Sequence, residues 1–387
     1  MDIEPALRRD PARPLSPPDS DPVLVEQLRS EISATGPITF ARFMSVAVGD
    51  PGRGYYATTD ERATRRGDFL TAPELHPIFG ATIARAIEVF WRALGRPATF
   101  TLREYGAGSG RLAIDVLAGL AERRSDLLDA IRYEPIELVP RRVELIHRRL
   151  ADAGFGDHLV DREVVGGDTP GVAGIALANE FLDALPVHRI EGNAGGIREL
   201  FVDWSSADSR FVDAAGPPST PAIAERLERA GVTLAEGQQA EVCLALDDWA
   251  DELTAWPARG FGLVIDYGLE AADLYRPDRR RGTLMAYAGH RAHEDPYVAI
   301  GRQDLTSHVD FTAVARAVER AGWRPAGLVG QATFVMANGL QDELERRRSD
   351  PALTPEAYLE LRSAVARLLD PRALGAFGVL VMSRGID

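Results

Sequence analysis

The sequence predicts an α/β protein whose core is a Rossmann-like, doubly wound sheet, with a helical region before it and an insertion within it. Three observations point to this fold. From residue 100 onward, short apolar runs of strand length alternate with longer stretches of helical periodicity. A glycine-rich turn directly follows the first of these strands. The alternation is absent before residue 99 and is interrupted between about 187 and 258.

The region 23–98 is expected to be mostly helical. Residues 23–33 space their apolar side chains at helical intervals. Thr39 is a favourable N-cap for a helix that runs through Val48, and Pro77 begins a longer amphipathic helix. We therefore expect this region to be a helical unit that precedes the sheet.

The core, 99–387, is expected to place its helices between parallel strands. Strands are predicted at 100–105, 130–133, 162–165, 174–178, 261–266, 331–336 and 378–383, and the first crossover helices at 111–123 and 140–153. The insertion, about 187–258, is expected to hold a hairpin and a helix and to lie over the carboxyl edge of the sheet, facing the substrate; its elements are predicted at 197–204, 210–212 and 221–230.

The composition excludes several classes of function. The chain has 387 residues, 45% hydrophobic and 26% charged, and no apolar run approaches the roughly 20 residues that span a bilayer. Its net charge is −14, and all 44 basic residues are arginines, so we expect no nucleic-acid partner. Cys243 is the only cysteine and no two histidines have a ligand spacing, so we expect no bound metal.

The first 22 residues are expected to be a disordered tail. They contain several acids and prolines and no apolar stretch, which is unlike a secretory signal or a transit peptide. We therefore expect a cytoplasmic protein.

The sharpest motif is the turn Glu104-Tyr-Gly106-Ala-Gly108-Ser-Gly110, between a strand and a helix. Glycines there allow a tight turn and the close approach of a ligand to backbone amides. A dinucleotide fingerprint would be GxGxxG, whereas here the third glycine comes one position earlier. Glu134 ends the second predicted strand, where a carboxylate can accept hydrogen bonds from ribose hydroxyls, as also happens in NAD enzymes. The motif predicts an adenosine-type ligand.

A second polar motif, which includes Asn179, Glu180 and Asp183, follows the strand predicted at 174–178. Ligands of open α/β sheets bind at the carboxyl ends of strands, so these side chains are candidate catalytic groups. Carboxylates would suit a guanidinium substrate. A carboxylate that accepts two N–H groups of the guanidinium holds the positive charge of the guanidinium on that side. The alternative is that Asn179 and Glu180 only cap the next helix.

With these motifs the chain resembles the MidA-like methyltransferases, a family that includes the mitochondrial complex I assembly-factor methyltransferase. The matching blocks are GPITFARFM at 36–44, DPGRGYY at 50–56, RRGDFLTAPELHPIFG at 65–80, EYGAGSG at 104–110, ANEFLDALPVHR at 178–189, GLVIDYG at 262–268 and GRQDLTSHVDF at 301–311. The resemblance implies a class I methyltransferase core, S-adenosyl-L-methionine as cofactor, and methylation of a protein arginine, best described for a respiratory complex I subunit.

The resemblance also implies roles for single residues. The cofactor contacts would be Glu104, Gly106, Gly108, Gly110 and Glu134. A lid over the cofactor would be formed by Asp68, Phe69 and Thr71. The substrate-side acids would be Glu180 and Asp183.

Other functions stay open at this point. The same fold serves small-molecule N- or O-methyltransferases, because loops can change while the core persists. A non-catalytic assembly chaperone that binds the cofactor for stability is a second alternative. A nicotinamide oxidoreductase is the least favoured, because of the glycine spacing.

Overall fold

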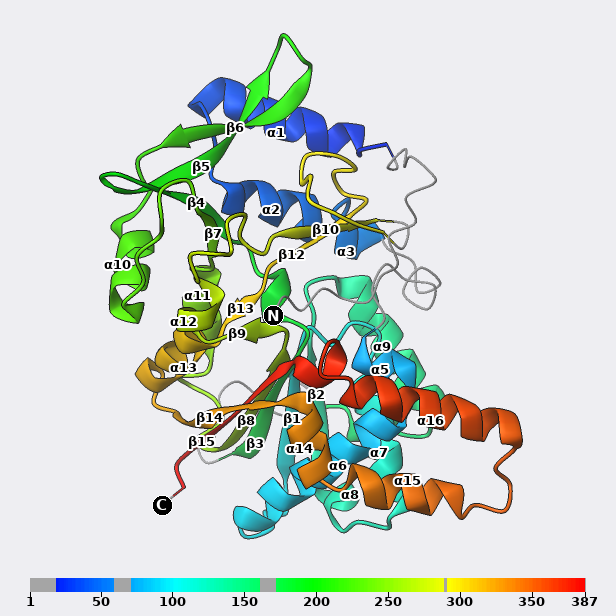
Figure 1. The fold of residues 1–387 in the computed structure, drawn as a ribbon. Helices are drawn as coiled ribbons and strands as arrows, with labels where there is room; N and C mark the ends of the chain where they lie inside the picture. Colours follow the sequence, from blue (N-terminus) through cyan, green and yellow to red (C-terminus); the bar gives the residue numbers. More distant parts are fainter. Residues whose placement is uncertain (1–18, 59–70, 161–171, 289–290, 387) are drawn as a thin grey trace.

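The core of the molecule is a six-stranded sheet. The computed structural model describes residues 19–58, 71–160, 172–288 and 291–386 (Figure 1). The spatial order of the strands is β14 (Arg324–Gly330), β15 (Gly378–Arg384), β8 (Arg259–Asp266), β3 (Ala173–Asn179), β1 (Phe100–Tyr105) and β2 (Ile131–Ile136). β1 pairs in parallel with β2 and β3, and β3 with β8, whereas β15 is antiparallel to both its neighbours. The predicted Rossmann-like α/β core is confirmed.

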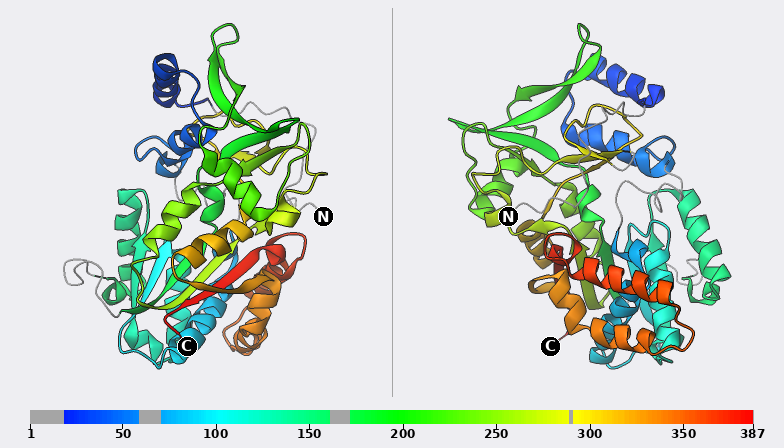
Figure 2. Two further views of the ribbon diagram at one scale, coloured as in Figure 1. Left: turned by 90° about the vertical axis from the view of Figure 1, so that its left-hand side faces the viewer. Right: turned by 45° about the vertical axis from the view of Figure 1, so that its right-hand side comes forward.

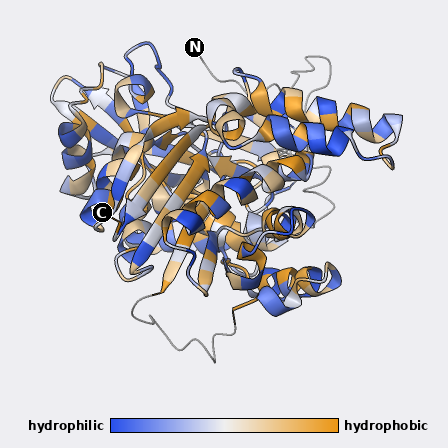
Figure 3. Cartoon of the chain, turned by 90° about the horizontal axis from the view of Figure 1, so that it is seen from below, coloured by the Kyte–Doolittle hydropathy of each residue, from blue (hydrophilic) through white to orange (hydrophobic). Residues whose placement is uncertain are grey.

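Helices cover both faces of this sheet (Figures 1 and 2). Because side chains alternate along a strand, β1 buries Phe100 and Leu102 on one face and Tyr105 on the other. The first face packs against α6 (Ile78–Ala93), α7 (Arg111–Glu122), α8 (Leu127–Ala130), α9 (Pro140–Asp152), α14 (Gln331–Ala337), α15 (Leu340–Arg348) and α16 (Pro355–Leu369). The second face packs against α11 (Ala245–Glu252) and α13 (Phe311–Arg320). Figure 3 shows the result: the central strands are largely hydrophobic, while the surrounding helices carry both kinds of residue.

A second unit, here called the upper lobe, consists of residues 21–58, 187–242, 285–288 and 291–306 and lies at the top of Figure 1. It contains one four-stranded antiparallel sheet and one three-stranded sheet. The strands of the first sheet, in spatial order, are β6 (Arg210–Gly216), β5 (Gly196–Ser205), β4 (His188–Asn193) and β7 (Gln239–Val242), with α10 (Pro221–Ala230) between β6 and β7 in the chain. The second sheet consists of β11 (Arg291–His293), β10 (Met285–Ala288) and β12 (Asp304–Thr306).

The helical N-terminal region is divided between the two units, which corrects the prediction of one unit at 23–98. The helices α1 (Pro22–Thr35), α2 (Phe40–Gly49) and α3 (Tyr55–Thr58) belong to the upper lobe. There, Phe43 packs against Phe211 of the insertion, and Ile38 forms an antiparallel bridge with Val202. In contrast, α5 (Ala72–Leu75) and α6 pack on the core. Apolar periodicity predicts each helix but not the surface against which it packs.

Two further predictions need correction. The strand predicted at 331–336 is wrong, because Gln331, Phe334 and Val335 lie on the buried face of α14 and the strand β14 ends at Gly330. The predicted tail 1–22 is too long: Asp21 is buried and caps α1, whereas 1–18 lie outside the described residues. The strand predicted at 162–165 also lies outside them. In the described ranges, no helix combines the length and the apolarity that a membrane crossing requires.

Asp21 connects α1 to the rest of the upper lobe, so its removal should destabilise the protein. Its carboxylate accepts hydrogen bonds from the backbone N–H groups of Val23 and Leu24 and pairs with Arg302 at 3.1 Å. We expect Asp21→Ala to lower the free energy of unfolding by about 1–2 kcal/mol, as measured by urea denaturation. The control is Asp19→Ala, at an exposed position, which should leave the unfolding curve unchanged. Equal curves for both variants would contradict the capping role.

Candidate active site

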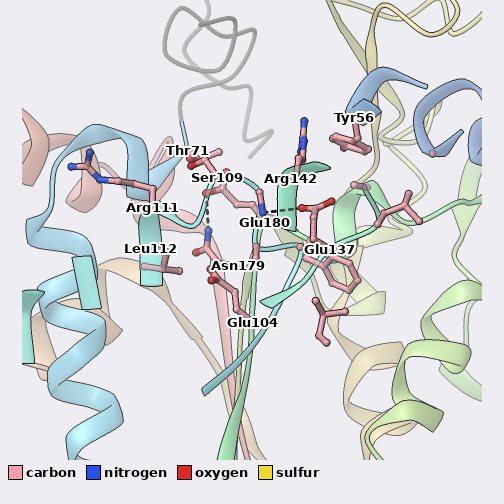
Figure 4. A pocket seen from close by; sticks show the side chains of 18 of the residues that line it. Tyr56, Thr71, Glu104, Ser109, Arg111, Leu112, Glu137, Arg142, Asn179 and Glu180 are labelled. Carbon is pink, nitrogen blue, oxygen red and sulfur yellow. Dashed lines mark hydrogen bonds between the residues drawn. The ribbon is translucent and has the colours of Figure 1, made fainter. Parts of the chain in front are cut away.

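A cavity of about 1260 Å³ opens at the carboxyl ends of β1, β2 and β3. Its wall includes the glycine turn, the start of α9, the segment after β3, and residues of α2 and α3 from the upper lobe. Figure 4 shows Glu104 and Asn179 at its base and Tyr56 on the side of the upper lobe. The site thus lies where the two units meet, at the edge of the sheet that the fold predicts for ligand binding.

The glycine turn brings a backbone without side chains to this cavity. Gly106, Gly108 and Gly110 have φ angles of 66°, 55° and 73°, which L-residues rarely adopt. A Cβ on Gly106 would come within 2.8 Å of the ring of Phe181, whereas a Cβ on Gly108 would meet nothing nearer than 3.8 Å. Gly106 is therefore needed for packing, and Gly108 leaves room beside the backbone for a ligand.

Glu104, the acid of the glycine motif, lies at the base of the cavity and is almost fully buried. The hydroxyl of Tyr133 donates a hydrogen bond to its Oε2 at 2.6 Å. Burial raises the pKa of Glu104 to about 7, although the bond from Tyr133 acts in the opposite direction. The group can therefore change its charge near neutral pH and would stabilise a cationic part of a ligand.

The acid that reaches the cavity after β2 is Glu137, which corrects the prediction of Glu134. Glu134 instead pairs with Arg103 of β1 at 2.8 Å and does not line the cavity. β2 continues through Ile136, so the strand ends three residues later than its apolar residues indicate. Glu137 lines the cavity, and its Oε2 accepts a hydrogen bond from the N–H of Gly108 at 2.9 Å. Glu137 thus has the position from which a carboxylate binds ribose hydroxyls.

Glu180 and Asn179 line the cavity directly after β3. Glu180 has a φ of 50°, a strained conformation for a residue with a side chain. Its N–H donates to the carbonyl of Ile265 at 2.8 Å, and its carboxylate accepts from Ala72 N–H and Asn179 Nδ2, both at 3.2 Å. Burial, together with the charge of Asp183, raises the pKa of Glu180 to about 8. The cap role considered for Asn179 and Glu180 is not observed, since only a short turn, η2 (Leu182–Ala184), follows.

Asp183 follows Glu180 in the chain but does not line the cavity. Only 6% of its surface is exposed. The hydroxyl of Tyr267 donates to its Oδ2 at 2.5 Å. Its Oδ1 is buried and accepts no hydrogen bond from any residue in the described ranges. Burial raises the pKa of Asp183 to about 6, against the effect of the bond from Tyr267.

Asp266, at the end of β8, was not among the predicted site residues. It is fully buried, and its Oδ2 accepts hydrogen bonds from the N–H groups of Phe181, Leu182 and Asp183 at 3.1, 2.9 and 3.3 Å. Burial, with the charges of Asp183 and Glu180, raises its pKa well above the usual range. The sequence could have indicated Asp266 as a site residue, because it lies at the carboxyl end of the strand predicted at 261–266. Asp266 holds the turn that presents Glu180 and Asp183.

The lid predicted from the GDFLT block can be located only in part. Asp68 and Phe69 lie outside the described residues, so their role stays a prediction. Thr71 lines the cavity at the start of α5, next to Ala72, whose N–H contacts Glu180. Thr71, the last residue of the GDFLT block, therefore lies beside both the cavity and the acidic segment, residues 179–183.

Three kinds of comparison show what this chain is similar to. A family model described as S-adenosyl-L-methionine-dependent methyltransferase matches residues 82–329. The chain belongs to this family. The methyltransferase is 30% identical to the mitochondrial protein arginine methyltransferase homologue of Drosophila melanogaster, over 94% of this chain and 85% of the relative. It is 31% identical to the mitochondrial protein arginine methyltransferase of Mus musculus, over 91% and 82% of the two chains.

A solved structure of a similar protein has the same fold as this chain. A protein from Burkholderia thailandensis, crystallised with S-adenosyl-homocysteine, is 34% identical to the methyltransferase and superimposes with a TM-score of 0.83 over 96% of each chain. These comparisons confirm the resemblance expected from the motifs, and with it the cofactor, S-adenosyl-L-methionine.

The residues of the cavity fit this cofactor. Gly108 leaves space beside the backbone, and Glu137 is placed for the ribose hydroxyls. The next residue, Leu138, lines the cavity with 59% of its surface exposed, and it would offer an apolar surface to the adenine of a bound cofactor. When bound, the cofactor supplies the methyl group, and the protein holds and orients it. Glu137 and Leu138 were missed because the end of β2 was predicted too early.

Two glutamates that lie three positions apart in the sequence, Glu134 and Glu137, allow a direct test of this assignment. We expect Glu137→Gln to weaken the binding of S-adenosyl-homocysteine about fivefold or more, since a charged acceptor contributes about 1 kcal/mol more than a neutral one. Glu134→Gln should leave this affinity unchanged, because the amide can still accept from Arg103 outside the cavity. Titration calorimetry measures both. A loss confined to Glu134→Gln would restore the original prediction.

Proposed function

We propose that this methyltransferase transfers its methyl group to an arginine side chain of a protein substrate. The observation that supports this most is a group of three carboxylates beside the cofactor cavity: Asp183 and Asp266, which are buried, and Glu180, which is half-buried. Within the described ranges, no ion pair joins any of the three to an arginine. Buried carboxylates without a cation are costly, so a cationic substrate would be the missing partner. The names of the Drosophila and mouse relatives support the same reaction.

The chemistry of a guanidinium explains why carboxylates are useful here. Arginine cannot be deprotonated in advance, because its pKa is above about 12. A carboxylate that accepts two of its N–H groups holds the positive charge on that side, and the opposite nitrogen is then better able to attack the methyl group. Methyl transfer releases a proton, and a half-buried carboxylate such as Glu180, whose pKa is about 8, is a suitable acceptor.

The identity of the substrate protein is a further part of the proposal. From the family resemblance, we propose that the substrate is a subunit of a respiratory complex I. We also propose that the methyltransferase acts in the cytoplasm. A small-molecule N- or O-methyltransferase and a cofactor-binding assembly chaperone are the alternatives. The acidic segment favours a cationic substrate over an O-methyl acceptor, and a chaperone would not need uncompensated carboxylates at the methyl-donor site.

Methyl transfer into lysate proteins tests the reaction. With radiolabelled S-adenosyl-L-methionine, the wild type should label an arginine in a protein of the host lysate, identified by acid hydrolysis and mass spectrometry. Asp183→Asn should lower this labelling at least ~30-fold, because it removes one partner of a buried charge pair. Glu241→Gln changes another buried acid, located in the upper lobe, and should label normally. Label only in small molecules, or none despite tight cofactor binding, would contradict the proposal.

The pH dependence provides an independent test. Burial raises the pKa of Glu180 to about 8 and that of Asp183 to about 6, so both groups are neutral at low pH and negative at high pH. A guanidinium needs the negative forms, and kcat/KM for an arginine peptide should therefore rise from pH 6 and level off above about pH 8. In Glu180→Gln the upper part of this rise should vanish. A profile that is flat from pH 6 to 9 would argue against carboxylates as the arginine ligands.

A further inference from the structure

A strand of the upper lobe that carries a carboxylate packs against the acidic segment of the core, residues 179–183. Strand β12 packs directly against the turn η2, which contains Asp183. The N–H of Ser307, just after β12, donates to the carbonyl of Asp183 at 3.0 Å. Asp304 is the first residue of β12, so the strand that carries Asp304 and the turn that contains Asp183 pack together from different units of the protein.

Two tyrosines surround this pair of aspartates. The hydroxyl of Tyr56 donates to Oδ1 of Asp304 at 2.7 Å. Tyr287 is the antiparallel partner of Asp304 on β10, so the two side chains lie on the same face of the small sheet. Burial, and then the charges of Asp304 and Asp183, raise the pKa of Tyr56 far above its usual value, and the same two charges act on Tyr287. Tyr56 and Tyr287 therefore both adjoin Asp304, one through a hydrogen bond and the other across the sheet.

A buried atom in this cluster lacks a partner. Asp183 is 94% buried, and its Oδ1 accepts no hydrogen bond from the described part of the chain, while its Oδ2 is held by Tyr267. A buried acceptor of this kind is costly unless a donor arrives. Tyr56 also lines the cofactor cavity, so the cluster borders the space from which a substrate would come.

The combination matches a guanidinium more closely than an ammonium group. A guanidinium is planar, carries five N–H donors on its edges and packs its faces against aromatic rings. Two carboxylates on different sides can each accept from one edge, with tyrosine rings beside the plane. An ammonium group is a compact, strongly hydrated charge without a plane that could pack between aromatic rings.

We propose that Asp304, Tyr56 and Tyr287 of the upper lobe complete the substrate subsite with Asp183 and make it selective for arginine over lysine. This inference rests on the proposed arginine methylation and adds to it the residues that determine specificity. The upper lobe is then part of the active site, since the core alone supplies only one side of the guanidinium.

The test measures binding of small probes to the full-length protein saturated with S-adenosyl-homocysteine. Methylguanidinium represents the arginine side chain and methylammonium the lysine side chain, with affinities from ligand-observed NMR. The wild type should prefer methylguanidinium. Asp304→Asn should weaken methylguanidinium binding about tenfold or more, raise KM for an arginine peptide by a similar factor, and leave cofactor affinity unchanged.

Asp213→Asn is the matched control. Asp213 lies on β6 and likewise accepts a hydrogen bond from a tyrosine of the upper lobe, Tyr297, but this tyrosine, unlike Tyr56, does not line the cavity. It should match the wild type in probe binding. If Asp304→Asn does not fold, Tyr56→Phe serves instead: it removes only the hydroxyl that orients Asp304, and should weaken methylguanidinium binding several-fold.

The outcomes separate this inference from the proposed function. If the wild type labels arginine and Asp183→Asn does not, but Asp304→Asn or Tyr56→Phe binds both probes like the control, the inference is wrong and arginine methylation stands. If the wild type neither binds methylguanidinium nor labels arginine, both are wrong.

Discussion

The carboxylate of Asp266 is the constraint on which the candidate site depends. One oxygen at the end of β8 accepts three consecutive backbone N–H groups, from Phe181 to Asp183. These donors follow β3, which is the parallel neighbour of β8, so the contact is a direct consequence of the sheet order. It supports the left-handed conformation of Glu180, whose own N–H bonds to Ile265 of β8. Without these hydrogen bonds to Asp266, the turn would lose three contacts that hold it in the conformation that positions its acids at the carboxyl edge of the sheet.

The upper lobe gives the site its second side. α1 to α3 come from the start of the chain and β5 and β6 from the insertion, yet their side chains share one apolar cluster. Figure 2 shows these segments in the same part of the molecule. This packing brings Tyr56 to the cavity wall and Asp304 to the turn that holds Asp183. The core thus supplies the cofactor site and its acids, and a separately packed unit supplies the wall that a substrate would meet.

The sequence predicted the parts that local rules control. Strand β1, the helices that follow β1 and β2, and the glycine turn lie where their patterns place them, because each depends on the residues that form it. The errors have specific causes. A proline usually marks the end of a strand, so Pro135 makes the sequence pattern of β2 end near Glu134. The strand nevertheless pairs with β1 through Ile136. The run 331–336 is rich in apolar residues and resembles a strand, but it packs one side on the core as a helix.

The sequence by itself determined the class of the core, an adenosine-type ligand and the segment 179–183 as the acidic edge, because a glycine turn and a strand-end motif are each contained in a few consecutive residues. The identity of the cofactor came from the family resemblance, which rests on motifs along most of the chain. Only the tertiary structure decided which glutamate faces the cavity, how Asp266 holds the acidic turn, and that Tyr56 of the cavity wall binds Asp304 on the strand packed against that turn. These relations join residues up to 248 positions apart. They depend on strand register and on the packing of two units, and neither is encoded in any local pattern.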